Sequence, residues 1–266
     1  VPAGILMVWG VVLAYFCISG RIASYLHPAF HIWTAASAGV LVLMAAGMLF
    51  LPGIDAECCD GDHDHPTPGN SGSRIFGALV LVVPLITAAI LSPSEFGATA
   101  VLNRGYVNSI ADLPGYKPYT EPSLPTEDGA GGPGETVSPD SYMPKNEAGQ
   151  IQAQTIDLIY AAEEPTMRED FENKEVEMIG QYMPAKENNQ QGNRFNLVRM
   201  FVMCCAADAR PVAVPVQMNP LEPLPEMSWI KVTGRATFPV EGGRRVPVVV
   251  ADSIKPCDPP DESFIY

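Results

Sequence analysis

Two hydrophobic patterns divide the chain. Three long runs, residues 1–20, 32–52 and 75–92, contain no charged side chain. A helix needs roughly 20 apolar residues to cross the hydrocarbon core of a bilayer, and lipid offers no water to an irregular backbone. We therefore predict about three transmembrane helices within residues 1–104. A secretory signal peptide is the alternative for the first run, although that run lacks a basic start.

Beyond residue 150 the pattern changes. A short helix is predicted over 151–164 from its apolar spacing. Period-two alternation, with Gly-rich and Pro-rich turns between the runs, then predicts five strands, over 175–185, 194–205, 210–218, 228–238 and 245–254. Five short strands and one helix, with the similar phrases VEMIG at 176–180 and IKVTG at 230–234, predict a small, mainly β, OB-like barrel.

A segment rich in Pro, Gly and acidic residues joins the two regions. Its composition could not form a core, so a flexible spacer is expected. The predicted organisation is a transmembrane domain over 1–104, a flexible linker over 105–150 and a soluble OB-like domain over 151–266.

Charge narrows the range of functions. The chain holds 30 acidic residues against 16 Lys and Arg, with a net charge of −14. Nucleic-acid binding needs clustered positive charge, so a nucleic-acid partner is not expected. All four histidines precede residue 66. The soluble domain therefore lacks a histidine base for a serine or cysteine nucleophile, and we do not expect an enzyme.

The loop ECCDGDHDH, residues 57–65, gathers metal ligands between two apolar runs. Thiolate and imidazole suit zinc or copper, and Cys58, Cys59, His63 and His65 could supply four ligands. Their spacing is not that of a zinc finger, so we predict a loose site that exchanges its metal. The alternative is a polar turn between two helices.

The phrase FVMCCAADARPVAV is the sharpest in the second half. If the strand ends at the cysteine pair, Cys204, Cys205 and Asp208 form a candidate metal or redox site, with Cys257 as a further candidate ligand. The alternative is that the cysteines are small packed residues. Asp208 could also cap the turn or pair with Arg210.

These phrases carry a family resemblance. CCAADA at 204–209, with ISGRIASYLHPAF at 18–30, LVVPLITAAILSPSEFGATAVLNRG at 81–105 and WIKVTGRA at 229–236, resembles the YcgQ-type family of two-component permease subunits. The resemblance implies an N-terminal membrane part, a C-terminal domain with the Cys-Cys-x-Ala-Asp-Ala signature, and a larger polytopic permease as partner. It also implies a multi-pass protein of the plasma or inner membrane with a non-cytoplasmic C-terminal domain, against a slight Lys and Arg excess that favours the opposite orientation.

Three functions remain open. The first is an accessory subunit of a membrane transport system that handles zinc or copper(I). The second is a membrane-tethered binding module with no transport role. The third is a thiol redox protein that uses Cys204 and Cys205, for which Arg210 is the nearby positive charge.

Overall fold

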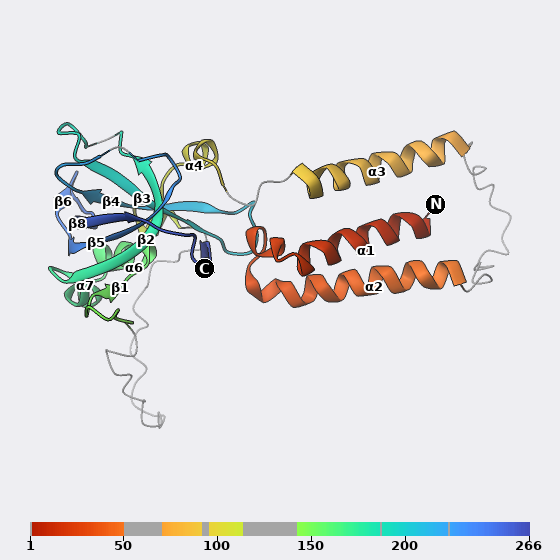
Figure 1. Cartoon of the computed structure of the whole chain (residues 1–266), viewed down its shortest axis with the longest axis horizontal. Coiled ribbons are helices and arrows are strands. Elements are labelled where there is room, and N and C mark those ends of the chain that lie inside the picture. Colours follow the sequence, from red (N-terminus) through yellow and green to blue (C-terminus); the bar gives the residue numbers. More distant parts are fainter. Residues whose placement is uncertain (1, 51–70, 92–95, 114–142, 187, 223) are drawn as a thin grey trace, which may run out of the picture. The chain divides into compact units, whose positions relative to one another are not determined.

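The computed structural model describes residues 2–50, 71–91, 96–113, 143–186, 188–222 and 224–266 (Figure 1). They belong to two compact units. One unit comprises Val1–Glu95 together with Cys204–Ala207, and the other comprises Phe96–Met203 together with Asp208–Tyr266.

The first unit contains three long helices. They are α1 (Pro2–Ile18), α2 (His31–Phe50) and α3 (Ser71–Leu91), and α1 packs against both of the others. Two 3-10 turns, η1 (Arg21–Ser24) and η2 (Pro28–Phe30), join α1 to α2. The chain is able to form these helices because their side chains are uncharged, apart from Arg74 and the histidine that begins α2.

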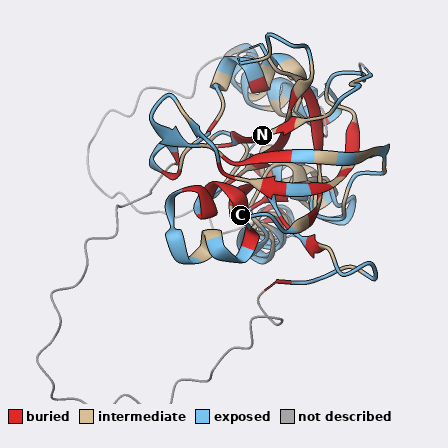
Figure 2. Ribbon diagram, turned by 90° about the vertical axis from the view of Figure 1, so that its left-hand side faces the viewer, coloured by how far each residue is buried: buried red, intermediate tan, exposed pale blue. Residues whose placement is uncertain are grey.

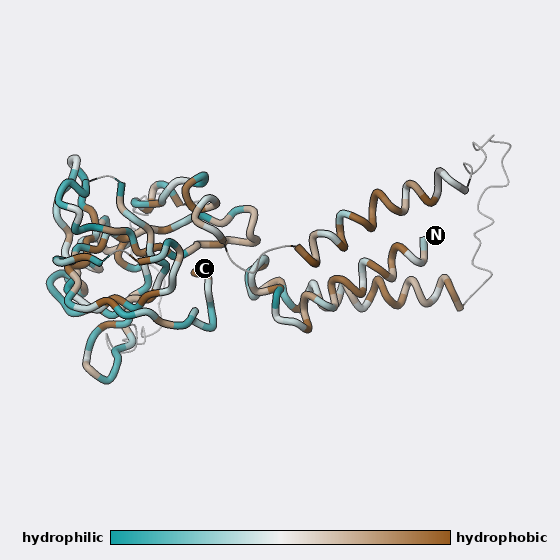
Figure 3. Tube along the Cα trace, turned by 45° about the horizontal axis from the view of Figure 1, so that its top comes forward, coloured by the Kyte–Doolittle hydropathy of each residue, from teal (hydrophilic) through white to brown (hydrophobic). Residues whose placement is uncertain are grey.

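Large apolar side chains lie on the outside of these helices. Figure 3 shows hydrophobic colour along most of their length, and the exposed residues include Ile18, Trp33, Phe50, Phe76 and Leu91. Among the described residues, one helical stretch, Pro28–Phe50, is long and apolar enough to cross a membrane, whereas Pro2–Ile18 and Ile75–Leu91 are shorter. One spanning candidate is therefore found where the sequence predicted three.

The second unit is built around a closed barrel. Its strands are β2 (Glu175–Pro184), β3 (Arg194–Phe201), β4 (Arg210–Gln217), β5 (Trp229–Thr237) and β8 (Val248–Pro256). Along the sheet the order is β2, β5, β8, β4, β3, and a β2–β3 pairing closes the ring. The neighbours are antiparallel except for β4 and β8, which are parallel. The predicted small β-barrel is confirmed, and its topology is consistent with an OB-like fold.

Shorter elements complete the second unit, and two of its short strands pair with the barrel strands β2 and β3. The strands are β1 (Ile151–Gln152), β6 (Val240–Glu241), β7 (Arg244–Arg245) and β9 (Phe264–Ile265). The helices are α4 (Ala98–Arg104), η3 (Ile110–Asp112), α6 (Thr155–Glu163) and α7 (Pro165–Phe171). Within the stretch 151–164, where a short helix was predicted, α6 begins at Thr155, and Ile151 and Gln152 pair with β2.

Inward-facing residues of the strands form the core. Figure 2 shows buried residues along the barrel strands, and the main cluster includes Phe195, Leu197, Val214, Ile230 and Val232. Alternation along each strand places these side chains on one face.

The glycines that end the phrases VEMIG and IKVTG lie where another side chain would clash with a neighbouring strand. A Cβ at Gly234 would lie 2.2 Å from the Val250 carbonyl oxygen, and one at Gly180 would lie 2.8 Å from Leu197 Cγ. Gly234 also adjoins a register shift between β5 and β8. Both glycines allow neighbouring strands to approach closely where the barrel bends.

Parts of the predicted linker pack on the barrel. Val107 exchanges backbone hydrogen bonds with β4, through Pro211 O at 2.8 Å and Ala213 N at 3.2 Å. Ile110 and Leu113 are buried in a cluster with residues of α6 and β4. The composition of the sequence did not indicate this packing, because these few apolar residues are surrounded by polar ones.

Candidate functional site

The CCAADA phrase forms a turn between two barrel strands. Strand β3 ends at Phe201 and β4 begins at Arg210. Val202 and Ala209 are each buried to 1% exposure, and the Val202 N–H donates to the Ile265 carbonyl at 3.0 Å. We call residues 203–208 the thiol turn. Its two ends are fixed in the barrel core, and the strand ends at Phe201, before the cysteine pair where the sequence predicted its end.

Three potential metal ligands meet within the thiol turn. The Sγ atoms of Cys204 and Cys205 and a carboxylate oxygen of Asp208 all lie within 4.8 Å of one another. The two sulfur atoms are 3.7 Å apart. Cys204 is exposed, and the other two residues are partly buried, so an ion could reach the group from solvent.

A backbone hydrogen bond orients the carboxylate. The Met203 N–H donates to Asp208 Oδ1 at 3.1 Å, which closes the turn across its width. Arg210, the predicted ion-pair partner, donates from its guanidinium to the Arg104 carbonyl at 3.3 Å. Capping of the turn by the Asp208 carboxylate is therefore observed.

Residues of the thiol turn also pair with the segment between α1 and α2. Leu26 and Cys205 form an antiparallel bridge. The His27 N–H donates to the Cys204 carbonyl at 3.1 Å, and the Ala206 N–H donates to the Tyr25 carbonyl at 2.7 Å. These backbone bonds fix the Cα–Cβ directions of both cysteines, which leaves their side-chain torsions as the main freedom.

The spacing of the ligand atoms suits a soft ion. Two thiolates bound at 2.3 Å to a tetrahedral zinc ion lie about 3.8 Å apart, close to the observed separation of the two sulfurs. Three protein ligands also leave a fourth position open, as in zinc sites that bind a water or a substrate. The donor set therefore fits zinc, and the thiolates fit copper(I).

The other predicted ligands are not part of this group. Cys58, Cys59, His63 and His65 lie outside the described residues. Cys257 follows β8, its N–H donates to the Trp229 carbonyl at 3.1 Å, and burial raises the pKa of its thiol. Among the described residues, Cys257 is not part of the ligand cluster formed by Cys204, Cys205 and Asp208.

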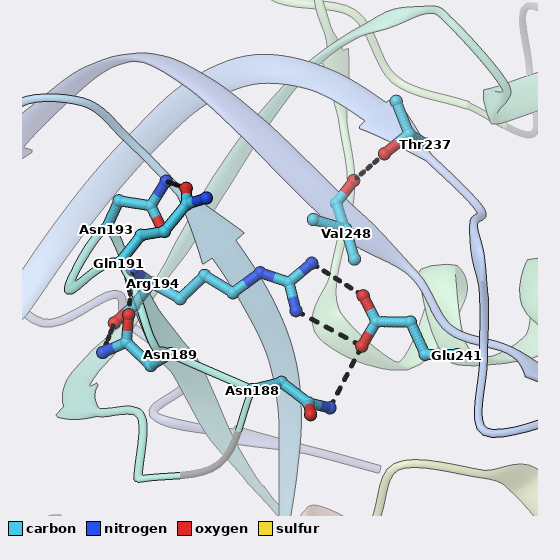
Figure 4. Close-up of polar contacts among 8 residues, drawn as sticks. All are labelled: Asn188, Asn189, Gln191, Asn193, Arg194, Thr237, Glu241 and Val248. Carbon is cyan, nitrogen blue, oxygen red and sulfur yellow. Dashed lines mark hydrogen bonds and ion pairs between the residues drawn. The ribbon is translucent and has the colours of Figure 1, made fainter.

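A second site was missed by the sequence reasoning. The Arg194 guanidinium forms a two-fold contact with the Glu241 carboxylate, at 2.7 and 3.2 Å (Figure 4). The Asn188 side chain donates to the same carboxylate at 3.2 Å. These residues come from β3, from the hairpin of β6 and β7, and from the β2–β3 loop. The signal available in the sequence was the run NNQQGN at 188–193, because most hairpin loops are shorter than this polar segment.

Comparison with known protein families assigns both halves of the chain to family domains. A model described as the DUF1980 N-terminal domain matches residues 2–107, and one described as the DUF1980 C-terminal domain matches residues 145–266. The chain belongs to the DUF1980 family. The DUF1980 C-terminal domain thus includes the barrel, the thiol turn and the Arg194–Glu241 pair.

Other comparisons add little to the DUF1980 assignment. A small single-stranded DNA-binding protein from Streptomyces coelicolor is similar over 33% of this chain and 95% of its own, with 14% identity and a TM-score of 0.22. The comparison with curated proteins found no match.

Proposed function

We propose that this chain is a membrane-anchored accessory subunit of a two-component permease system, and that its thiol turn holds zinc or copper(I). One observation carries the proposal: the ligand atoms of Cys204, Cys205 and Asp208 lie within 4.8 Å of one another. The backbone pairing of Cys204, Cys205 and Ala206 with residues 25–27 supports a turn of defined backbone conformation.

The donor set selects the class of ion. Calcium and magnesium require six or more oxygen ligands in most protein sites, and this group offers one carboxylate. Thiolates prefer zinc and copper(I), and an exposed site with an open position favours exchange over permanent retention. A transport accessory needs that exchange, because it must release what it binds.

The helical unit supports the membrane part of the proposal. Pro28–Phe50 is long and apolar enough to span, and the exposed faces of α1 and α3 are also apolar. We extend this to three spans, with the barrel on the non-cytoplasmic side of the plasma or inner membrane. The apolar faces that α1, α2 and α3 leave exposed would then contact lipid and the larger polytopic subunit.

Metal content tests the site directly. The full chain is purified anaerobically in detergent, incubated with zinc or copper(I), desalted and analysed for metal per chain. Two backgrounds separate the two candidate sites: one in which Cys58, Cys59, His63 and His65 are changed to Ala, and one with Cys204→Ser and Cys205→Ser. The matched control is Cys257→Ser, which removes a thiol outside the turn.

The thiol turn should keep about one ion in the loop-changed background and in the control. That ion should be lost when Cys204 and Cys205 are replaced, while the melting temperature stays within a few degrees. Equal metal in the presence and absence of these two cysteines would overturn the site. Appearance of a Cys204–Cys205 disulfide in the native chain, with no metal, would instead favour the redox function.

Topology and partnership need separate measurements. Single cysteines at Ser71 and Ser123 in a cysteine-free variant should react with an impermeant reagent from opposite sides of the membrane. Reaction from one side would exclude three spans. Affinity isolation from native membranes should recover a polytopic protein, and its repeated absence after crosslinking would remove the permease role while leaving the metal site intact.

A further inference from the structure

A groove lies over the Arg194–Glu241 pair, between the β2–β3 loop and the hairpin of β6 and β7. Two hollows of about 390 and 510 Å³ adjoin there, and both are lined by Asn188, Arg194, Glu241 and Gly242. Their combined extent is within the range of small-ligand sites. We call the two hollows together the barrel groove.

Three separate parts of the chain form the barrel groove. The β2–β3 loop supplies one wall, the hairpin of β6 and β7 supplies the opposite one, and residues 105–108 after α4 extend the larger hollow. In the order of the five barrel strands, these two walls are the loop between the first and second strands and the loop between the fourth and fifth. Such loops are where OB-type barrels receive oligonucleotides and oligosaccharides.

The β2–β3 wall is held in place before any ligand arrives. Asn189 donates to the Arg194 carbonyl at 3.0 Å and accepts from the Arg194 N–H at 2.9 Å (Figure 4). It also donates to the Ala185 carbonyl at 3.1 Å. Three bonds from one amide close this loop on itself. Preorganisation of this kind lowers the entropy that binding must offset.

Carboxamides dominate the polar lining. Each of them can donate and accept hydrogen bonds at once, as a sugar hydroxyl also does. They are Asn108, Asn188, Gln190, Gln191, Asn193, Asn196 and Gln217. Their density gives the groove many hydrogen-bonding groups without net charge.

The charged residues in the groove largely cancel. Arg194 and Glu241 are mostly buried, with side chains 16% and 23% exposed, and they neutralise each other through the two-fold contact. Lys186 is the further charged side chain that lines the larger hollow. Among the described residues that line the groove, a polyanion such as a nucleic acid would find one unbalanced positive charge, which is far fewer than its phosphates require.

Apolar surface is present beside the polar groups. Leu102, Pro184, Pro215 and Val246 line the larger hollow together with Tyr106. Burial raises the pKa of the Tyr106 hydroxyl, while the neighbouring Asn196 amide opposes that change, so the phenol stays neutral at physiological pH. Sugar rings present C–H faces and hydroxyl edges, and this lining offers a counterpart to each.

We propose that the barrel groove binds a short neutral oligosaccharide across the Arg194–Glu241 pair. The carboxamides and the ion pair bond its hydroxyls, and the prolines and Tyr106 contact its C–H faces. This site is independent of the metal at the thiol turn, and its presence would give the subunit a second ligand of a different chemical class.

The test uses the full chain in a detergent without a sugar headgroup, so that the detergent cannot occupy the groove. Maltopentaose, cellopentaose and chitotetraose are the neutral probes, and a sulfated pentasaccharide and an oligothymidine are the charged ones. For at least one neutral probe, calorimetry should give a dissociation constant below about 1 mM, which is the affinity of a weak site. The proposal would be overturned if only the charged probes bound, or if no probe bound at a concentration of about 5 mM.

Variants then locate the site. Asn196→Ala combined with Gln217→Ala should weaken binding at least tenfold, roughly the loss of one or two good hydrogen bonds. Gln152→Ala removes an exposed carboxamide outside the groove and should leave affinity unchanged. Glu241→Gln keeps the shape but leaves Arg194 uncompensated, and should also weaken neutral binding. If both groove variants kept the affinity and the melting temperature of the unchanged chain, the ligand would not bind in the barrel groove.

Discussion

The two units of this chain bury opposite kinds of residue. In the described residues of α1, α2 and α3 the buried positions hold small residues, Ala3, Gly10, Ala38, Ala45 and Ala89, while large apolar side chains face outward. In the barrel unit the buried positions hold large ones such as Phe171, Phe195 and Met178. The hydrophobic effect can fold the barrel in water, but in lipid it gives the helices no reason to associate, so close packing of small residues must do so.

The difference implies that the units respond to different perturbations. Loss of shape complementarity inside the barrel should be felt as a loss of stability against urea, which acts on buried surface. Changes at the helix contacts should alter packing in detergent or lipid and leave the barrel unaffected. The predictions that follow separate these two behaviours, beginning with the largest effect.

Gly234→Ala should destabilise the barrel most. The new Cβ would meet the Val250 carbonyl oxygen, which belongs to backbone and cannot rotate away. We expect a loss of about 3 kcal/mol or more in the free energy of unfolding, at the upper end of overpacking effects. Urea unfolding of the full chain in detergent, followed by hydrogen exchange of the barrel strands, measures it.

Gly180→Ala is the matched control for that change. Its nearest neighbour is the Leu197 side chain, which can shift, although the Val198 carbonyl oxygen is also close at 3.0 Å. A smaller loss, about 1–2 kcal/mol, is expected. If both variants unfolded at the wild-type urea concentration, close approach of strands would not be what these glycines provide.

The sequence predicted much of the barrel because its signal is local. Alternation located β2 and β4 to within a residue, and the end of β3 was placed four residues late because its apolar run continues into the thiol turn. Cys204, Cys205 and Asp208 could be grouped beforehand since they lie within five consecutive positions. Adjacent positions stay close in any fold.

The barrel groove could not be predicted in the same way. Arg194 and Glu241 lie 47 residues apart and meet only because the barrel brings its loops together. The packed residues of 105–113 were hidden by a polar composition, and the predicted linker boundary followed composition alone. Sites assembled from distant segments depend on strand order, which periodicity does not reveal.

Arg199→Met should have the next largest effect. The Arg199 side chain is only 7% exposed, and it donates to the carbonyls of Ile179, Glu262 and Phe264 at 3.3, 2.6 and 3.3 Å. Methionine would leave those carbonyls without this donor, so we expect a loss of about 2–3 kcal/mol. The residues around β9 should then exchange amide hydrogens faster than the rest of the barrel.

Arg235→Met supplies the comparison for Arg199. Its guanidinium pairs with Glu175 at 3.5 Å, and both side chains are well exposed, so little stability is at stake. Its unfolding midpoint should stay near that of the unchanged chain. Equal destabilisation by the two substitutions would show that burial of Arg199 is not the cause.

Gly10→Ala should affect the helical unit alone. A Cβ there would lie 2.7 Å from Val42 Cγ2 and 3.1 Å from the Ala38 carbonyl oxygen, at the contact of α1 with α2. We expect about 1–2 kcal/mol of weakened packing. Energy transfer between dyes on the two helices during denaturation in SDS measures it. Gly4→Ala, where nothing lies within 4 Å of the new atom, is the control, and a shift of the barrel midpoint in urea would contradict the separation of the units.

The smallest effect concerns acid and the Arg194–Glu241 pair. Hydrogen bonds from Arg194 hold the pKa of the Glu241 carboxyl below its ordinary value, which is about 4.3 for a free glutamate. The unfolded chain therefore takes up this proton first as the pH falls. The pair contributes its full stability above the ordinary value and loses it as the pH drops through the lower folded value.

The contribution of this pair should be about 1 kcal/mol or less, because solvent screens a partly exposed ion pair. As the pH falls from about 6 to about 3.5, the urea midpoint of the native barrel should decrease more than the midpoint of Glu241→Gln. Salt at about 1 M should reduce this difference, because it screens the ion pair. Helices α1 and α3 contain no Asp, Glu or His, so their hydrogen exchange, corrected for its intrinsic pH dependence, should not change over the same range. Identical pH profiles for the native chain and Glu241→Gln would mean that the pair orders the groove without stabilising the barrel.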